Sequence, residues 1–221
     1  MSGVCAVMVF AKAPLAGYAK TRLIPALGVA GAARLAERML VHAVGQAVAA
    51  DIGPVEVCAA PNATHPVFDG LAALHALVLT AQGAGDLGAR MQRAFARRLA
   101  ATSAPAVEAA LLIGTDAPAL HAVRLRHARD ALTGHDAVFV PALDGGYALV
   151  GLRRPAPALF ASLLAALFDG MTWSAPTVMA RTRERLAALG LRVAQLEAVA
   201  DIDEPADLVH VPPAWLEAAA P

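Results

Sequence analysis

Basic side chains gather in the stretch Ala11–Arg22, which follows the first apolar run of the chain. Lys12, Lys20 and Arg22 lie there among small residues and a flexible Gly17. Two or three cations and exposed backbone N–H groups can together surround phosphate oxygens. The stretch has neither GxxxxGK[ST] nor GxGxxG, so the P-loop and dinucleotide fingerprints do not apply. A solvated basic loop is the alternative, but cations directly after a strand favour phosphate binding.

A single carboxylate, Asp116, follows the apolar run Ala110–Ile113. A carboxylate at the end of a strand is well placed for a divalent cation, and Mg²⁺ commonly takes only one or two carboxylates plus substrate phosphates. Pro118 can begin the next helix, so Asp116 can instead cap that helix. Because the basic stretch implies a phosphate nearby, we favour the metal role.

More acids stand near the end of the chain, where Asp201, Asp203 and Glu204 precede Pro205. Alternation places Asp201 and Asp203 on one side of an extended segment, where one or both can complete a cation site begun by Asp116. Capping of a short helix by Asp203 ahead of Pro205 competes with this reading. The spacing leaves both open.

Two glycine-rich turns complete the set of candidates. In the first, Gly83, Gly85 and Gly88 allow a ligand to approach the backbone, and Arg90 follows. Asp86 in that turn fits a nucleotide contact and a helix cap equally well. In the second turn, Asp144 is our candidate for contacting and deprotonating a substrate that acts as the acceptor of a transferred group, although Asp144-Gly145-Gly146 is also an ordinary hairpin turn. Trp173 is interpreted as a packing residue, with stacking on a base or sugar as the alternative.

Short apolar runs alternate with longer Ala/Leu/Arg segments of helical spacing. Continuous apolar runs are typical of strands buried on both faces, and the alternation predicts a mainly parallel mixed sheet in a three-layer α/β/α sandwich. The expected strands are Val4–Phe10, Val55–Ala60, Leu77–Leu79, Ala110–Ile113, Ala137–Val140, Tyr147–Gly151 and Leu191–Leu196. The expected helices are Ala30–Ala50, Leu87–Ala101, Ala119–Leu132 and Ala175–Leu189, with Pro176 in the first turn of the last, and the tail from Val211 is expected to be irregular.

Composition limits the classes of protein. Hydrophobic residues make up 58% and charged residues 16% of 221 residues, which predicts one globular domain over 1–221. The formal net charge is zero, so nucleic acid is not expected as a partner. No membrane segment or signal peptide is recognised, so a cytoplasmic location is expected. Cys5 and Cys58 are interpreted as free core thiols, and the seven histidines show no metal-ligand spacing.

Six motifs in order resemble a family of bacterial GT-A-type glycosyltransferase-like proteins, long known as a domain of unknown function, beside the MobA-like nucleotidyltransferases and the 2-phospholactate guanylyltransferases. The motifs are FAKAPLAGYAKTRL, QGAGDLGARM, GTDAPAL, PALDGGYALVGL, MTWSAPTV and DIDEPADL. The resemblance covers Val4 to about Leu208 and implies a nucleotide-diphospho-sugar transferase fold. It further implies base and phosphates on Ala11, Lys12 and Ala13, and a divalent metal on Asp116.

The resemblance bears on the reaction in two ways. In similar nucleotidyltransferases a second acid or amide precedes a late threonine–proline, and Asp203 takes that place here with Glu204 in place of the threonine. A glycosyltransferase of this fold commonly has an Asp-x-Asp motif, whereas Thr115-Asp116-Ala117 supplies one acid. The arrangement of one acid at Asp116 and a second at Asp203 thus favours nucleotidyl transfer, while the family's name indicates glycosyl transfer.

We therefore expect a transferase that acts on a nucleotide-activated donor, with Mg²⁺ or Mn²⁺ as cofactor and a small-molecule acceptor. Lys12, Lys20 and Arg22 would neutralise charge on the leaving phosphates, with Lys20 and Asp116 taking part in catalysis. Glycosyl transfer is the main hypothesis and nucleotidyl transfer the alternative. A non-catalytic nucleotide sensor is a third, against which Asp116 and Asp203 together argue. A homodimer is left open.

Overall fold

The computed structural model describes residues 4–100, 106–154, 157–173 and 175–217. In this part of the chain, seven strands form one sheet in the order β3-β2-β1-β4-β6-β5-β7. The strands are β1 (Cys5–Lys12), β2 (Val55–Ala60), β3 (Val78–Ala81), β4 (Ala109–Ile113), β5 (Ala137–Pro141), β6 (Tyr147–Arg153) and β7 (Val193–Gln195).

Most neighbouring strands of the sheet are parallel. β1 pairs in parallel with β2 and β4, β2 with β3, and β5 with β7. β6 is antiparallel to β4 and to β5 because the turn at Asp144 connects β5 and β6 directly. The predicted mixed, mainly parallel sheet is confirmed.

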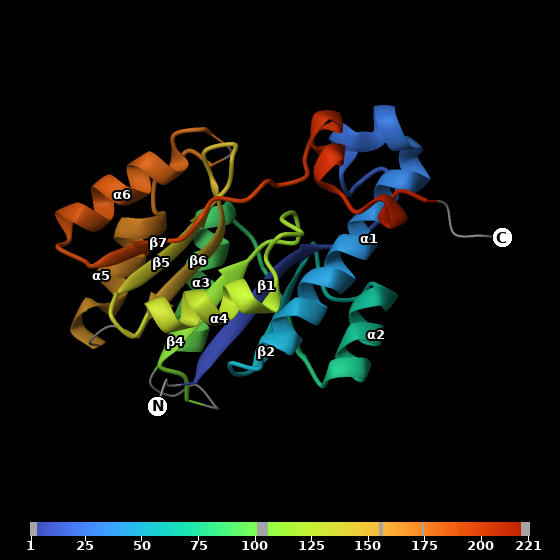
Figure 1. Ribbon diagram of the computed structural model, residues 1–221. Helices are drawn as coiled ribbons and strands as arrows, with labels where there is room; N and C mark the ends of the chain where they lie inside the picture. Colours follow the sequence, from blue (N-terminus) through green and yellow to red (C-terminus); the bar gives the residue numbers. More distant parts are fainter. Residues whose placement is uncertain (1–3, 101–105, 155–156, 174, 218–221) are drawn as a thin grey trace.

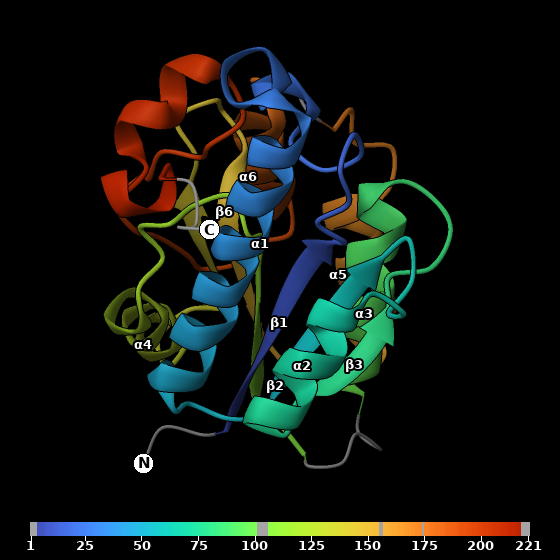
Figure 2. The same ribbon diagram turned by 90° about the vertical axis from the view of Figure 1, so that its right-hand side faces the viewer.

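Helices cover both faces of the sheet, so the expected three-layer sandwich is also confirmed. Side chains alternate along each strand, and β1 is buried on both faces up to Ala11. One face packs against α1, α2 and α4, and the other against α3, α5 and α6. Figure 2 shows α1 and α4 on one side of β1 and α3 on the other. The helices are α1 (Ile24–Ala50), α2 (Pro66–His75), α3 (Leu87–Leu99), α4 (Ala122–Ala131), α5 (Pro157–Phe168) and α6 (Val178–Ala188).

A third, smaller core joins the two ends of the described chain. Leu23, Leu35 and Met39 from the start of the chain pack with Ile202 and Val211 from its end. The short 3₁₀ turns η2 (Pro205–His210) and η3 (Pro213–Trp215) therefore lie beside the first turns of α1 (Figure 1). A further 3₁₀ turn, η1 (Thr21–Leu23), leads from the basic loop into α1. These contacts bring the acids after β7 to the same sheet edge as the loop after β1.

Several element boundaries differ from the sequence-based expectations. α1 begins at Ile24 rather than Ala30, with Pro25 in its first turn and a non-helical Gly28 at a kink. α6 begins at Val178, so Pro176 precedes the helix instead of lying in its first turn. The tail from Val211 includes η3, and the expected helix end at Ala101 lies outside the described residues.

Two helices of the structure, α2 and α5, were not expected from the sequence. α2 lies in a stretch rich in Pro, Asn and Gly, where turn-forming residues masked a helix of only ten residues. Among the described residues, none of the helices is long and apolar enough to cross a membrane.

Candidate functional site

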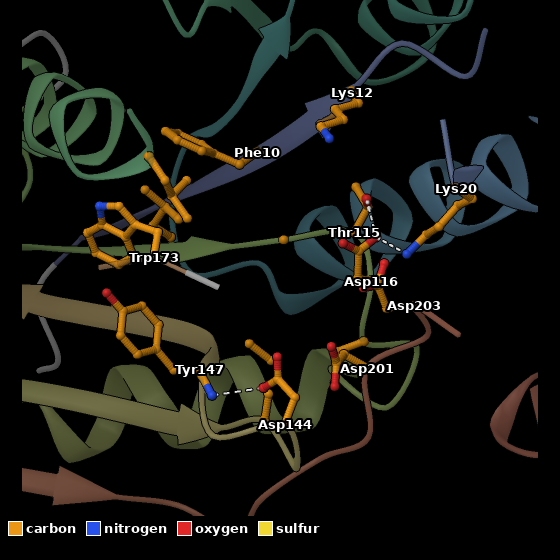
Figure 3. Close-up of a pocket in the computed structure, with 18 of the residues that line it drawn as sticks. Phe10, Lys12, Lys20, Thr115, Asp116, Asp144, Tyr147, Trp173, Asp201 and Asp203 are labelled. Atoms are coloured by element: carbon orange, nitrogen blue, oxygen red, sulfur yellow. Dashed lines mark hydrogen bonds and ion pairs between the residues drawn. The ribbon is translucent and has the colours of Figure 1, made fainter. Parts of the chain in front are cut away.

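A pocket of about 660 Å³ lies at the carboxyl ends of β1 and β4, where the strand-to-helix loops meet. Its two ends differ in chemistry. Figure 3 shows Lys20, Asp116 and Asp203 at one end and Phe10, Tyr147 and Trp173 at the other. We call these the charged end and the aromatic end of the pocket.

Lys20 ties together three segments at the charged end. Its side chain is only 8% exposed, and Nζ lies 2.6 Å from Asp116 Oδ1 while also donating to the carbonyl oxygen of Ile202. The Ile202 N–H in turn donates to the Asp116 carbonyl at 2.8 Å. The basic loop, the loop after β4 and the segment after β7 are thus joined around one ammonium group.

A second ion pair, between Arg22 and Asp203, distinguishes Asp203 from Asp201, although the sequence pattern treats these two acids alike. Arg22 NH1 lies 2.6 Å from Asp203 Oδ2 and 3.8 Å from Glu204 Oε1. Asp207 accepts from the backbone N–H groups of Asp203 and Glu204 at 2.9 and 2.7 Å, which fixes the start of η2. Asp203 therefore already has a cationic partner.

Asp201 and Asp144 have no ion pair within 4.0 Å among the described residues, although both line the pocket. Burial raises the pKa of Asp201, and the negative charges of Asp144 and Asp116 raise it further. Three carboxylates thus repel one another around the charged end. Asp144 stands between the two ends, and one of its oxygens accepts from the Gly146 N–H at 2.8 Å (Figure 3).

The carboxylates at the charged end suit a divalent cation that is bound only partly by the protein. Among the described residues, no three His, Cys, Asp or Glu side chains already converge closely enough to hold a metal by themselves. Mg²⁺ usually takes one or two carboxylates and completes its shell with water and phosphate oxygens. The negative charge of Asp201 and Asp144, beside an Asp116 that already pairs with Lys20, fits such a partly protein-bound ion.

The other predicted nucleotide-binding residues lie in different places. Ala11, Lys12 and Arg90 line the pocket, and Lys12 is exposed. Ala13 and Asp86 are not among the described lining residues. Ala13 is 2% exposed in the core, and its N–H donates to the Ala60 carbonyl.

Asp86 caps α3 by accepting from the Ala89 N–H at 2.8 Å. The sequence left two roles open for Asp86, a nucleotide contact and a helix cap, and the structure shows the helix cap. Arg90 supports the same turn, because its Nε donates to the Gly85 carbonyl at 2.9 Å.

Sequence reasoning did not single out several lining residues, some of them because they lie inside apolar strands. Phe10 and Leu112 belong to apolar runs, and Gln82 lies where β3 ends. The Gln82 carboxamide donates to the Cys58 carbonyl at 2.9 Å, which anchors the loop after β3 to β2. The sequence did carry a signal for Tyr147, because the turn Asp144-Gly145-Gly146 places it at the same sheet edge as the Asp144 carboxylate.

Comparisons with known proteins agree with the fold. A family model described as "Uncharacterized protein conserved in bacteria (DUF2064)" matches residues 42–175. No curated protein matches the chain. A solved structure from Desulfovibrio desulfuricans G20, assigned to the nucleotide-diphospho-sugar transferases, is 28% identical with a TM-score of 0.80, over 92% of this chain and 84% of that one.

Two more distant structures share the fold alone. A nucleotidyl transfer enzyme, the "nucleotidyl transferase from Methanothermobacter thermautotroptrophicus", is 15% identical with a TM-score of 0.61, over 96% of this chain and 98% of that one. A Mycobacterium tuberculosis H37Rv protein in complex with manganese is 16% identical with a TM-score of 0.52, over 95% and 97%. The expected nucleotide-diphospho-sugar transferase superfamily is confirmed.

Proposed function

The chain belongs to the bacterial family DUF2064 and has the fold of nucleotide-utilising transferases, and we propose that it is a metal-dependent glycosyltransferase whose donor is a nucleotide-diphospho-sugar. One observation carries the proposal: Lys12, Lys20 and Arg22 line a single pocket together with Asp116 and Asp201. Cations beside carboxylates, of which Asp201 has no ion pair within 4.0 Å among the described residues, suit a metal–diphosphate group, which needs both charges.

The chain's own residues then bind and orient the donor. Lys12 and Lys20 carry the charge that would bind phosphate oxygens, and the Lys20 contact with Ile202 holds the segment that carries Asp201. Asp116 and Asp201 are the residues that would hold Mg²⁺ or Mn²⁺, with Asp203 as a further acid. The bound ion would supply Lewis-acid neutralisation of the leaving diphosphate. The manganese complex of the Mycobacterium tuberculosis protein supports Mn²⁺ as the ion to test first.

Nucleotidyl transfer is the second candidate, and one observation favours it. The loop after β4 supplies one acid, Asp116, rather than an Asp-x-Asp pair, and the other acids come from the segment after β7. In that reaction the α-phosphorus is attacked and pyrophosphate leaves, whereas glycosyl transfer releases a nucleoside diphosphate. The 28% identical relative supports glycosyl transfer.

The test separates the two reactions by their leaving groups. The purified protein is incubated with Mn²⁺ and panels of nucleoside triphosphates and of nucleotide sugars, and the released pyrophosphate and nucleoside diphosphate are measured. We expect nucleoside diphosphate from one nucleotide sugar. Pyrophosphate alone would refute glycosyl transfer, and release of neither product would refute both transfer reactions for the donors in the panels.

A matched pair of variants assigns that turnover to the site. Asp116→Asn removes the carboxylate at the end of β4 and should lower kcat by about 10²-fold or more, comparable to loss of one transition-state contact. Asp69→Asn changes an exposed acid of α2 that is not among the described lining residues, and should leave kcat unchanged. Equal activity of the two variants would remove Asp116 from the site.

A further inference from the structure

We propose that the aromatic end of the pocket binds the acceptor, and that this acceptor is an uncharged, hydroxyl-bearing molecule with an apolar or ring-shaped body. The inference rests on the proposed function, because it assigns the second substrate of the same pocket. It excludes acceptors whose reacting part carries phosphate or carboxylate groups.

Positive charge is distributed unevenly around the pocket. The described cations that line it are Lys12 at the end of β1, Lys20 and Arg22 in the stretch that follows, and Arg90 in the first turn of α3. The described lining residues from the β5–β6 turn, β6 and the segment before α6 include no lysine or arginine. An anionic acceptor on that side would meet no lysine or arginine from these elements and would face Asp144 and Asp201, at a cost in free energy that an uncharged molecule avoids.

The aromatic rings at this end are held in place by packing. Tyr147 and Trp173 meet edge to face, with ring centroids 6.5 Å apart at 89°. The Trp173 ring also lies against Gly88 of α3, so closely that a Cβ at Gly88 would come within 2.9 Å of the ring. A rigid aromatic surface binds the apolar face of a ring without first losing side-chain freedom.

Asp144 stands where the two ends meet, and its turn is fixed by close packing (Figure 3). The φ of Gly145 is +92°, and a Cβ there would lie 2.2 Å from the Pro176 carbonyl oxygen, so only glycine fits. An acceptor on the aromatic rings therefore presents its hydroxyl beside a carboxylate. An oxygen–carbon bond to the anomeric carbon would form while the bond from that carbon to the diphosphate oxygen breaks. The nucleoside diphosphate leaves with the electron pair, and the hydroxyl proton passes to Asp144.

The experiment measures binding by calorimetry on the full chain. UDP, GDP, CDP and ADP are first titrated with Mn²⁺ present, and the tightest is kept at saturation. Phenyl β-D-glucopyranoside and its 6-phosphate are then titrated as probes. We expect the uncharged glucoside to bind at least 10-fold more tightly than the 6-phosphate.

Variants test whether the glucoside binds at the aromatic end. The chain has two tryptophans, Trp173 and Trp215, and the second lies in η3 and is not among the described lining residues. Trp173→Ala should weaken the glucoside at least 10-fold while changing the nucleotide affinity less than 3-fold. Trp215→Phe is the matched control and should change neither.

The outcomes distinguish failure of the proposed function from failure of the acceptor assignment. If none of the four nucleotides binds, the proposed function itself fails. If a nucleotide binds but the 6-phosphate binds as tightly as the glucoside, if neither glucoside binds, or if Trp173→Ala leaves glucoside binding intact, the acceptor assignment is overturned and the donor site stands.

Discussion

Replacing Lys20 by methionine tests whether one ammonium group holds the charged end of the pocket together. Methionine keeps most of the apolar stem and removes the charge and the donors. The change deprives the Ile202 carbonyl and the Asp116 carboxylate of the same partner. It leaves the direct hydrogen bond from the Ile202 N–H to the Asp116 carbonyl in place.

The expected loss of stability follows from the burial of each partner. Ile202 is 0% exposed, so its carbonyl has little access to water once Lys20 is removed, which costs about 1–3 kcal/mol. The Asp116 side chain is 54% exposed and regains water, so loss of its ion pair costs only about 0.2–1 kcal/mol. The variant no longer buries an ammonium group, which offsets part of the sum. We expect a net loss of about 2 kcal/mol in the free energy of unfolding.

Urea denaturation measures that loss, since a shift of the midpoint at constant m-value reports stability alone. For a chain of this size, about 2 kcal/mol also corresponds to a fall in Tm of about 4–8 °C. Lys12→Met is the matched control, because Lys12 belongs to the same basic region but is exposed and has no ion pair within 4.0 Å among the described residues. A loss below about 0.5 kcal/mol for Lys20→Met, or an equal loss in both variants, would refute the role of Lys20 as the joining group.

Two further predictions concern the frame around the pocket. Burial alone would raise the pKa of Asp136, but the Arg192 N–H and the Arg153 guanidinium outweigh it and lower that pKa below the ordinary value of an aspartate. The stabilisation is therefore complete above about pH 4 and lost as the pH falls through the lowered pKa. Asp136→Asn should cost about 1–2 kcal/mol at pH 7 in urea denaturation, and a difference from the wild type that persists undiminished at pH 2.5 would contradict the pairing. Gly145→Ala should lower stability by about 2–4 kcal/mol in thermal unfolding, because the new Cβ meets the Pro176 carbonyl at 2.2 Å and φ is +92°. Gly134→Ala, where a Cβ meets nothing within 4 Å, should change stability by less than about 0.5 kcal/mol, and similar losses at both positions would rule out the close approach as the cause.

Local pattern was enough to predict the strands that form the centre of the fold. The run Val4–Phe10 is apolar at successive positions because β1 is buried on both faces, and that continuity is visible without a structure. The antiparallel β6 was also predictable, since Asp144-Gly145-Gly146 makes a turn too short for a crossover helix. α2 was not predictable in the same way, because ten residues rich in turn formers owe their helical state to the packing of Phe68 and Leu71 on the sheet.

Candidate residues for the charged end could be named from the sequence, because a basic loop and a lone acid each follow a strand and parallel strands end at one edge of the sheet. Which of these residues pair with one another could not be predicted from the sequence. The contacts of Lys20 with Asp116 and Ile202 join residues up to 182 positions apart, and they depend on the small core that packs the chain's last turns against α1.

The tertiary structure also decided how the acids differ and what lies opposite them. Asp203 pairs with Arg22, whereas Asp201 has no ion pair among the described residues, although the two side chains are only two positions apart. The aromatic end includes residues that look like ordinary core or packing residues in the sequence, such as Phe10 and Trp173. Residue type and spacing therefore predict which groups can do chemistry at a sheet edge. Only the packing of distant segments decides which charges are neutralised and which surfaces face the same space.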